Sequence, residues 1–245
     1  ASSLSAVTIG SLALDQENHI VAGGTVALSA GQDIAFRNAG SFVTGMIDAP
    51  GAVDLTSVNG SITQANATFI TAGTLAVAAA NGGITLDQAN LIATLGGLTA
   101  GADVIFRSVS GFAIDGDIQA DGHDVALTSD SGAITQTGGI VTAGSLSLTA
   151  MDGIDFGAAN QVAALNATNS GGSGGIRFVN DSSLTVGSLV SDTGDLSLLL
   201  TQGQLTLGGG SFSLGNTDIE AAGGIDATGT IDSRQSVRMV SGGSI

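Results

Sequence analysis

The residues best suited to chemistry lie in one acidic run, Asp115-Gly-Asp-Ile-Gln-Ala-Asp-Gly-His-Asp124. Its candidate metal ligands are Asp115, Asp117, Asp121 and Asp124. Hard carboxylate oxygens of this kind suit calcium. However, the twelfth position is Ala126, where an EF-hand loop has a bidentate Glu, and the Gly-Gly-x-Gly-x-Asp nonapeptide of calcium β-rolls is missing. The run therefore predicts solvated carboxylates at chain corners, with a calcium site and a catalytic carboxylate pair as alternatives.

Enzymatic chemistry has few other residues to draw on. The two histidines are His19 and His123, and neither lies in a Gly-x-Ser-x-Gly elbow. Asp15, Glu17 and His19 alternate along the chain, as the outward edge of a polar strand does. Cysteine is absent, which excludes disulfides, zinc–thiolate sites and thiol catalysis. We expect no enzymatic activity and no cofactor. A glycosidase or polysaccharide lyase remains the alternative, because a β-helix face needs only two or three acids for that reaction.

The composition of the 245 residues favours a repetitive β-structure. Glycine occurs 39 times, and the residues between the glycines are mostly small or β-branched, which suits strands joined by tight corners. Hydrophobic residues make up 43% of the chain, enough for a core. Twenty-one acidic residues face five arginines and no lysine, so the net charge is −16 and nucleic acid is a poor partner. No apolar run reaches about 18 residues, so we expect no membrane insertion.

A short sequence pattern recurs along the chain. A Thr-Ala-Gly corner appears at 71–73, 99–101 and 142–144, and an Ile-Thr strand begins at 62, 84 and 134. Apolar residues alternate within the strands between these corners, so one side of each strand should point inward. Anchoring each copy on its first strand residue gives positions 26, 53, 75, 104, 125 and 146. The shorter intervals predict one coil of about 20 residues, and the longer intervals predict insertions of variable length.

The repeat length and period-two alternation predict an all-β fold, a right-handed parallel β-helix (β-solenoid) of about 11 coils. We expect a single continuous solenoid over 1–245, with regular coils over 1–157 and less regular coils over 158–245, where 171–175 form a flexible Gly-rich insertion loop. Uncapped terminal coils would aggregate, so we expect the natural chain to continue in both directions. Four phenylalanines at strand ends should form internal ladders. They are Phe36, Phe106, Phe156 and Phe178.

One segment carries a family resemblance. Gly144-Ser-Leu-Ser-Leu148 followed by Asp152-Gly-Ile154 resembles the haemagglutinin-type repeats of large bacterial exoproteins, the filamentous haemagglutinin-like adhesins exported by two-partner secretion. The resemblance covers most of residues 20–157. It implies a bacterial cell-surface or extracellular-matrix location and a fibre-like shape. The Asn-Pro-Asn motifs of that family's amino-terminal secretion domain are missing, since the only proline is Pro50 in Ala-Pro-Gly.

The function that these features favour is that of a structural shaft, a rigid spacer in an extracellular adhesin or fibre. Its expected partners are neighbouring coils of the same longer chain, other copies in a fibre, and cell-surface glycans. A calcium-stabilised matrix fibre is a further alternative. Tryptophan and tyrosine, the usual platforms for sugars, are absent. Arg234 and Arg238 are expected to pair with nearby aspartates rather than to bind an anionic ligand.

Overall fold

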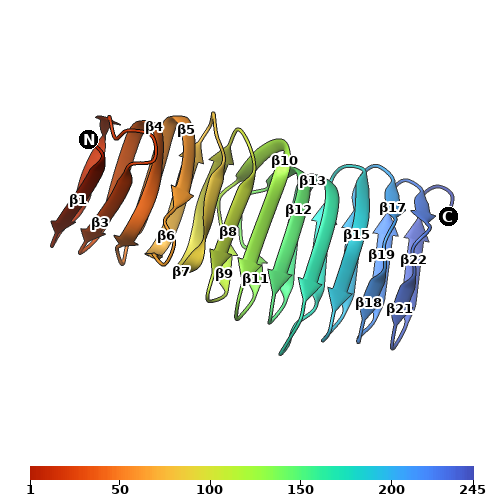
Figure 1. Ribbon diagram of the computed structural model, residues 1–245. Helices are drawn as coiled ribbons and strands as arrows, with labels where there is room; N and C mark the ends of the chain where they lie inside the picture. The colour runs from red at the N-terminus through yellow and green to blue at the C-terminus, as the bar shows by residue number, and fades with distance from the viewer.

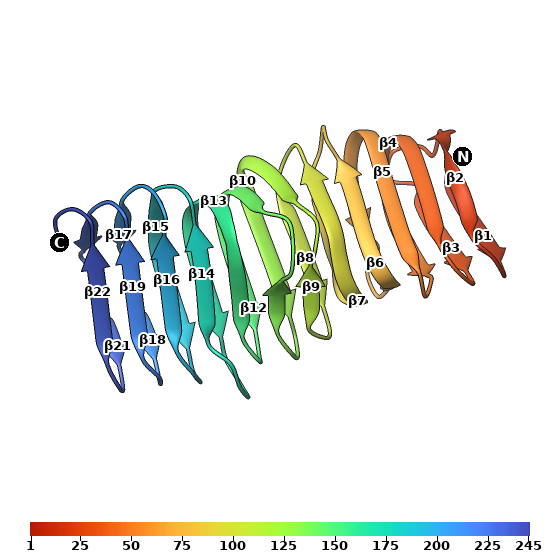
Figure 2. The same cartoon turned by 180° about the vertical axis from the view of Figure 1, so that it is seen from behind.

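The computed structural model describes residues 1–245 as a β-solenoid of about 11 stacked coils without a helix. The coils form a row with the two chain ends at opposite ends of it (Figure 1). Figure 2 shows the strands on the opposite side of the same row. No helix is present that could cross a membrane. The predicted fold class, a parallel β-solenoid of about 11 coils, is confirmed.

Twenty-two strands make up the coils, and every pairing between them is parallel. They are β1 (Ser3–Thr8), β2 (Leu12–Asn18), β3 (Thr25–Ala30), β4 (Ile34–Asp48), β5 (Ala52–Gln64), β6 (Ile70–Ala79), β7 (Ile84–Ala100), β8 (Val104–Ser108), β9 (Phe112–Ile114), β10 (Ile118–Ser129), β11 (Ile134–Gln136), β12 (Val141–Ala150), β13 (Ile154–Asn169), β14 (Ile176–Asn180), β15 (Leu184–Ser191), β16 (Leu196–Leu200), β17 (Leu205–Leu207), β18 (Ser211–Ser213), β19 (Thr217–Ala221), β20 (Ile225–Ala227), β21 (Ile231–Ser233) and β22 (Val237–Ser241).

The strand register gives the length of each coil. One column of residues paired from coil to coil is Phe42, Ile62, Ile84, Val104, Val125, Leu146, Leu165, Val186, Leu207 and Ala227. The spacing along this column is nearly constant and matches the predicted coil of about 20 residues. The segment 171–175 lies in the coil from Leu165 to Val186, which is as long as its neighbours, so the predicted insertion adds no length there.

Side chains alternate inward and outward along each strand, which builds one core. Fifty-five buried residues form a single hydrophobic cluster that runs through the coils. Ile84 and Phe106 are fully buried, whereas Thr85 lies between two inward side chains of β7 and is only half-buried. The predicted inward and outward positions are therefore confirmed for these three residues.

The phenylalanines stack less regularly than predicted. Phe156 and Phe178 are register partners in adjacent coils, with ring centroids 5.9 Å apart, so this ladder is confirmed. The other two rings pack edge-to-face against a ring of a following strand segment and not on a register partner. The pairs are Phe36–Phe42, with centroids 5.0 Å apart, and Phe106–Phe112, with centroids 5.2 Å apart.

Each coil contains three strand segments, and stacked segments form three walls. The coil that starts at Val104, for example, consists of β8, β9 and the first part of β10 before Val125 continues the first wall. We call the wall of β8 wall 1, that of β9 wall 2 and that of 118–120 in β10 wall 3. One wall and its corner therefore use about a third of a coil.

The insertions predicted from the long anchor intervals are wrong. The anchor Val26 pairs with Thr44, whereas the anchor Val53 pairs with Ile34. Thr44 and Ile34 lie ten residues apart in β4, about half a coil, so the two anchors lie on different walls. The two long intervals, from 26 to 53 and from 75 to 104, each exceed a coil by about one wall with its corner. The next copy of the anchor strand therefore lies on the next wall, and no extra loop is inserted. Local sequence is similar on all three walls, which explains the mistaken alignment.

The chain also contains a repeat that is longer than one coil. Residues 31–100 and 101–171, which we call the long repeat units, share motifs in the same order, such as Phe36-Arg37 with Phe106-Arg107 and 62–64 with 134–136. Ile62 pairs with Ile84 in wall 1, whereas Ile134 pairs with Phe112 in wall 2. Each long repeat unit therefore spans three coils plus one wall.

Candidate functional site

The acidic run singled out above lies on two corners of one coil. Asp115 and Asp117 flank Gly116 between β9 and β10, and both side chains are exposed. Asp121 and Asp124 lie in an irregular part of β10, where the register with β12 shifts between residues 120 and 124. The strand segment 118–120, with both its end residues buried, separates the two corners. The structure therefore divides the four candidate ligands into two pairs.

The first pair of carboxylates binds the next coil. Asp117 Oδ1 accepts a hydrogen bond from the backbone N–H of Ile140 at 2.9 Å, and Asp115 Oδ1 accepts one from the Thr137 hydroxyl at 3.4 Å. A half-buried corner amide thus finds an acceptor one coil back, in the manner of a capping side chain. This geometry supports the interpretation of the run as corner residues.

The same contact recurs at other corners, so it is a property of the repeat. Three further aspartates accept a backbone N–H from the following coil at 2.7 to 3.1 Å. The pairs are Asp33–Ala52, Asp103–Asp124 and Asp195–Asn216. No three histidine, aspartate or glutamate side chains come together as a group that could hold a metal ion. The calcium site at the acidic run stays a prediction.

The histidines lie beside carboxylates on the surface. His123 Nδ1 is 3.7 Å from Asp103 Oδ1, and His19 Nε2 is 4.0 Å from Glu17 Oε1. All four side chains are exposed to solvent by 44% or more of their surface. The arrangement offers an exposed ion pair in each case when the histidine is protonated.

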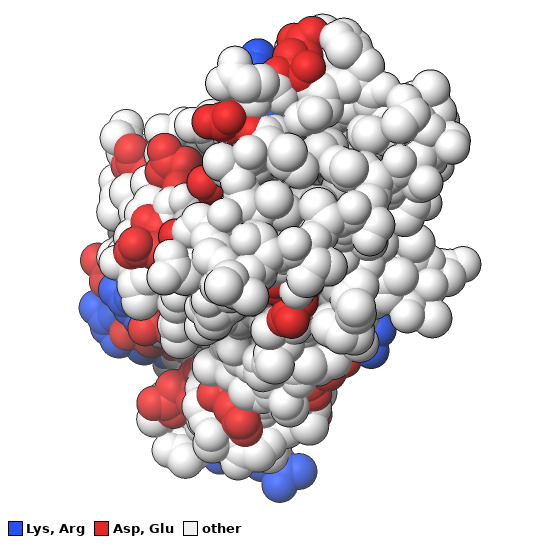
Figure 3. All heavy atoms as spheres, turned by 90° about the vertical axis from the view of Figure 1, so that its left-hand side faces the viewer, with Lys and Arg blue, Asp and Glu red and all other residues white.

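In the end-on view of Figure 3 the charged side chains are mainly acidic, and most of them lie along one side of the coils. Arg107 makes a bidentate pair with Asp130, with Nε–Oδ1 and Nη2–Oδ2 distances of 2.9 and 2.7 Å. The hydrogen bond and the charge of Asp130 raise the pKa of Arg107. Arg238 Nη1 lies 2.7 Å from Asp218 Oδ1, which confirms the predicted pairing of this arginine. Arg234 makes no ion pair, so the predicted pairing is wrong for this arginine.

A surface groove of about 490 Å³ crosses four coils along wall 2 and the corner that precedes it. Its lining includes the corner glycines Gly153, Gly174 and Gly194. Arg177 Nη1 contacts Asp155 Oδ1 at 3.0 Å inside it. The groove offers an arginine and a carboxylate that already pair with each other in this structure.

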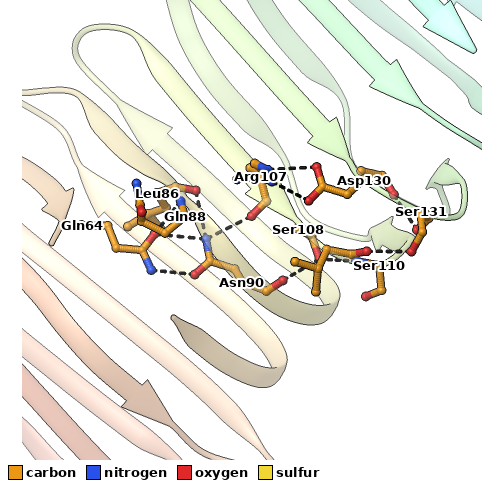
Figure 4. A network of polar contacts seen from close by, with 11 residues as sticks. Gln64, Leu86, Gln88, Asn90, Arg107, Ser108, Ser110, Asp130 and Ser131 are labelled. Atoms are coloured by element: carbon orange, nitrogen blue, oxygen red, sulfur yellow. Dashed lines mark hydrogen bonds and ion pairs between the residues drawn. The ribbon is translucent and has the colours of Figure 1, made fainter. Parts of the chain in front are cut away.

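A densely hydrogen-bonded polar group lies inside the solenoid. Asn90 is fully buried and joins three coils (Figure 4). Its Oδ1 accepts hydrogen bonds from the backbone N–H of Ile70 and from Gln64 Nε2, at 2.8 and 2.7 Å. Its Nδ2 donates to the Leu86 and Arg107 carbonyls, each at 3.0 Å, and to Gln64 Oε1 at 3.1 Å. The amide satisfies backbone groups where the chain turns from one wall to the next and the strand ladder is interrupted.

The second long repeat unit builds the same network on the next wall. Asn160 Oδ1 accepts from Val141 N at 2.8 Å and from Gln136 Nε2 at 2.9 Å, and Asn160 Nδ2 donates to Val179 O at 3.1 Å. Two other buried asparagines bind corner amides in a similar way, Asn38 with Ile20 and Asn180 with Val162. The equivalent contacts show that the two units fold alike on different walls.

Sequence reasoning missed these asparagines, although two signals pointed to them. Asp-Gln-x-Asn occurs at 15–18 and at 87–90, and Ile-Thr-Gln occurs at 62–64 and at 134–136. Each glutamine of the second motif precedes its asparagine partner by 24 or 26 residues, slightly more than one coil. A glutamine and an asparagine separated by slightly more than one coil length thus indicate a contact between buried amides of adjacent coils.

The comparisons with known proteins concern the same repeat. Residues 31–99 match a family described as repeats of unknown function (DUF5649). The match begins with the first long repeat unit at Gly31 and ends one residue before that unit does. It includes both Gln64 and Asn90, whose side chains connect adjacent coils. No curated protein and no solved structure matches the chain.

Proposed function

We propose that this chain is a structural shaft, a rigid spacer in a large bacterial cell-surface or extracellular-matrix adhesin or fibre. The observation that supports it most is the uninterrupted core of 55 buried residues, built from coils of nearly constant length. Each coil pairs with its neighbours on either side, so adding coils extends the rod without creating a new cavity. At about 4.8 Å a coil, about 11 coils give a rod near 50 Å long.

The polar contacts also fit a mechanical role. Corner aspartates and buried asparagines bind backbone groups of adjacent coils, so the most specific polar side chains connect coils along the axis. Such contacts resist separation of coils because each broken one leaves a backbone group without its partner. Extracellular location, lateral assembly and contact with glycans are parts of this proposal that follow the family resemblance.

A coil deletion in the parent protein tests the proposal. Asp124 pairs with Ser145, so removal of residues 123–143 joins equivalent points of successive coils. We expect a fibre shorter by about 4.8 Å, with surface attachment of the bacterium unchanged. Electron microscopy and an adhesion assay measure the two quantities. Loss of attachment with an intact rod would contradict the spacer role. Polysaccharide turnover that Asp117→Asn abolishes would instead favour catalysis.

A further inference from the structure

The sequence Asn-x-Ser/Thr, the acceptor signal for N-linked glycans, occurs four times in the chain. The copies begin at Asn59, Asn66, Asn166 and Asn180. The structure places them in very different settings. Asn180 is fully buried, and its Nδ2 donates to Val162 O at 3.0 Å, so it can carry no substituent in the folded chain. The buried copy shows that the motif by itself does not define an acceptor here.

Two of the other copies lie within strands. Asn166 is in the middle of β13, whose backbone pairs with β12 on one side and β15 on the other. Its amide lies against Gly187, where an added Cβ would come within 2.5 Å of Asn166 Oδ1. Asn59 belongs to β5, and its Oδ1 accepts a hydrogen bond from Asn81 Nδ2 at 3.3 Å. Both asparagines are exposed, but each is held against a neighbouring coil.

Asn66 alone occupies a turn. It follows Ala65 between β5 and β6, it is exposed, and its side chain makes no hydrogen bond. Ala67 has a φ of 60°, the left-handed conformation that turns the chain sharply. The Thr68 hydroxyl donates to the Ala65 carbonyl at 2.7 Å and closes the turn. The Asn66 amide therefore projects from a tight surface turn, where N-linked glycans are found.

An apolar patch lies beside this turn. Phe69 is 41% exposed, and Met46 and Leu91 are each 49% exposed. The Ile47 N–H donates to Phe69 O at 3.1 Å, which places Met46 beside Phe69 in the previous coil, and Leu91 pairs with Thr71 in the next one. Three adjacent coils thus each expose a large apolar side chain near this turn, and eight further large apolar side chains are exposed elsewhere on the chain.

We propose that Asn66 is the acceptor of an N-linked glycan that covers Met46, Phe69 and Leu91. The donor is a sugar activated as a glycosyl phosphate or pyrophosphate, used by a separate transferase. A bond forms between Asn66 Nδ2 and the anomeric carbon, and the anomeric carbon–oxygen bond to phosphate breaks with its electron pair on the departing oxygen. The amide loses one proton to solvent or to the transferase. A bulky polar chain so close to Phe69 in the sequence would shield that ring from water and from other proteins.

Mass spectrometry of the full protein isolated from its native cells tests this inference, which rests on the extracellular location proposed above. We expect the peptide containing Asn66 to carry glycan mass increments, which Asn66→Gln and Thr68→Ala abolish and Thr68→Ser retains. Asn166→Gln is the matched control and should leave the modification of Asn66 unchanged. An unmodified Asn66 beside a rod of the expected length would overturn the glycan and leave the shaft proposal intact.

A hydrophobic dye reports on the second half of the proposal. Enzymatic removal of the glycan should increase dye fluorescence of the native protein severalfold, because the patch becomes accessible. The increase should be absent when Phe69→Ser is combined with the same treatment. Equal fluorescence before and after glycan removal would overturn the covering role even if Asn66 is modified.

Discussion

Gln64 and Asn90 form a reciprocal amide pair between adjacent coils, with Nε2–Oδ1 and Nδ2–Oε1 distances of 2.7 and 3.1 Å. The pair closes a corner that no strand ladder closes, since Asn90 also binds the backbone of Ile70, Leu86 and Arg107. Its counterpart, Gln136 with Asn160, does the same on the next wall. Buried amides thus connect coils at the places where backbone pairing is incomplete.

Replacement of Asn90 by Ala should lower the free energy of unfolding by about 2–4 kcal/mol. The change leaves one backbone N–H and two carbonyls of the interior without a partner, and each such group costs about 1–3 kcal/mol before water enters. Denaturant unfolding followed by circular dichroism measures the loss. Asn81→Ala is the matched control, because Asn81 is exposed and donates to Val58 O at the surface. A loss no larger than that of Asn81→Ala would contradict the role of the buried amide.

Introduction of aspartate should separate inward from outward positions. Phe106→Asp and Ile84→Asp place a charge in the continuous core and should unfold the chain at ambient temperature, a cost above about 4 kcal/mol. Thr85→Asp should change the free energy of unfolding by about 0.5 kcal/mol or less, because its side chain faces outward. Thermal melts of the three variants provide the comparison. Equal destabilisation at positions 84 and 85 would show that the assigned faces are incorrect.

Removal of a buried hydroxyl near the carboxyl-terminal coils should stabilise the chain. Thr217 Oγ1 and Ser211 Oγ are buried and have no hydrogen-bond partner. Thr217→Val keeps the shape and removes the cost of an unpaired hydroxyl, so we expect a gain of about 1 kcal/mol. Thr44→Val serves as the control, since Thr44 Oγ1 donates to Thr63 O at 3.3 Å. Loss of this hydroxyl should lower the free energy of unfolding. A lower melting temperature for Thr217→Val would indicate that an internal water satisfies the hydroxyl.

Spin labels can distinguish walls from sequence repeats. Thr63 and Thr85 are register partners, so labels at these positions should lie about 5 Å apart at the backbone and broaden each other's spectra strongly. Thr63 and Thr135 are equivalent in the two long repeat units but lie on different walls, so labels there should not broaden. Continuous-wave electron paramagnetic resonance spectra of the two double variants measure the broadening. Strong broadening between positions 63 and 135 would rule out the wall change.

Residue patterns alone were sufficient for much of this fold. Alternation such as Leu146-Ser-Leu148 places every second side chain inward whatever the neighbouring coil is, because period two is a property of the strand itself. Glycine and aspartate at intervals mark corners for equally local reasons. A repeat of about 20 residues with these two signals is enough to predict a parallel solenoid, and the structure confirms it.

The contacts of the acidic run could not be predicted from local sequence. Asp115 and Asp117 were correctly expected at a corner, because they flank a glycine between two short strands. Their partners, Thr137 and Ile140, belong to the next coil and are not identified by anything in the run itself. A carboxylate that caps a distant amide has the same local sequence as a free one.

The sequence by itself determined the strands, the corners, the inward faces and the approximate coil length, since each depends on local pattern and its recurrence. Only the tertiary structure decided which wall each strand occupies. A strand with its corner takes about a third of a coil, so a shift of one wall leaves the local pattern unchanged. Stacking against the previous coil selects the wall, and contacts such as Gln64–Asn90 form only between coils that are already in register. Those two residues lie 26 apart in the chain, beyond the reach of any local rule.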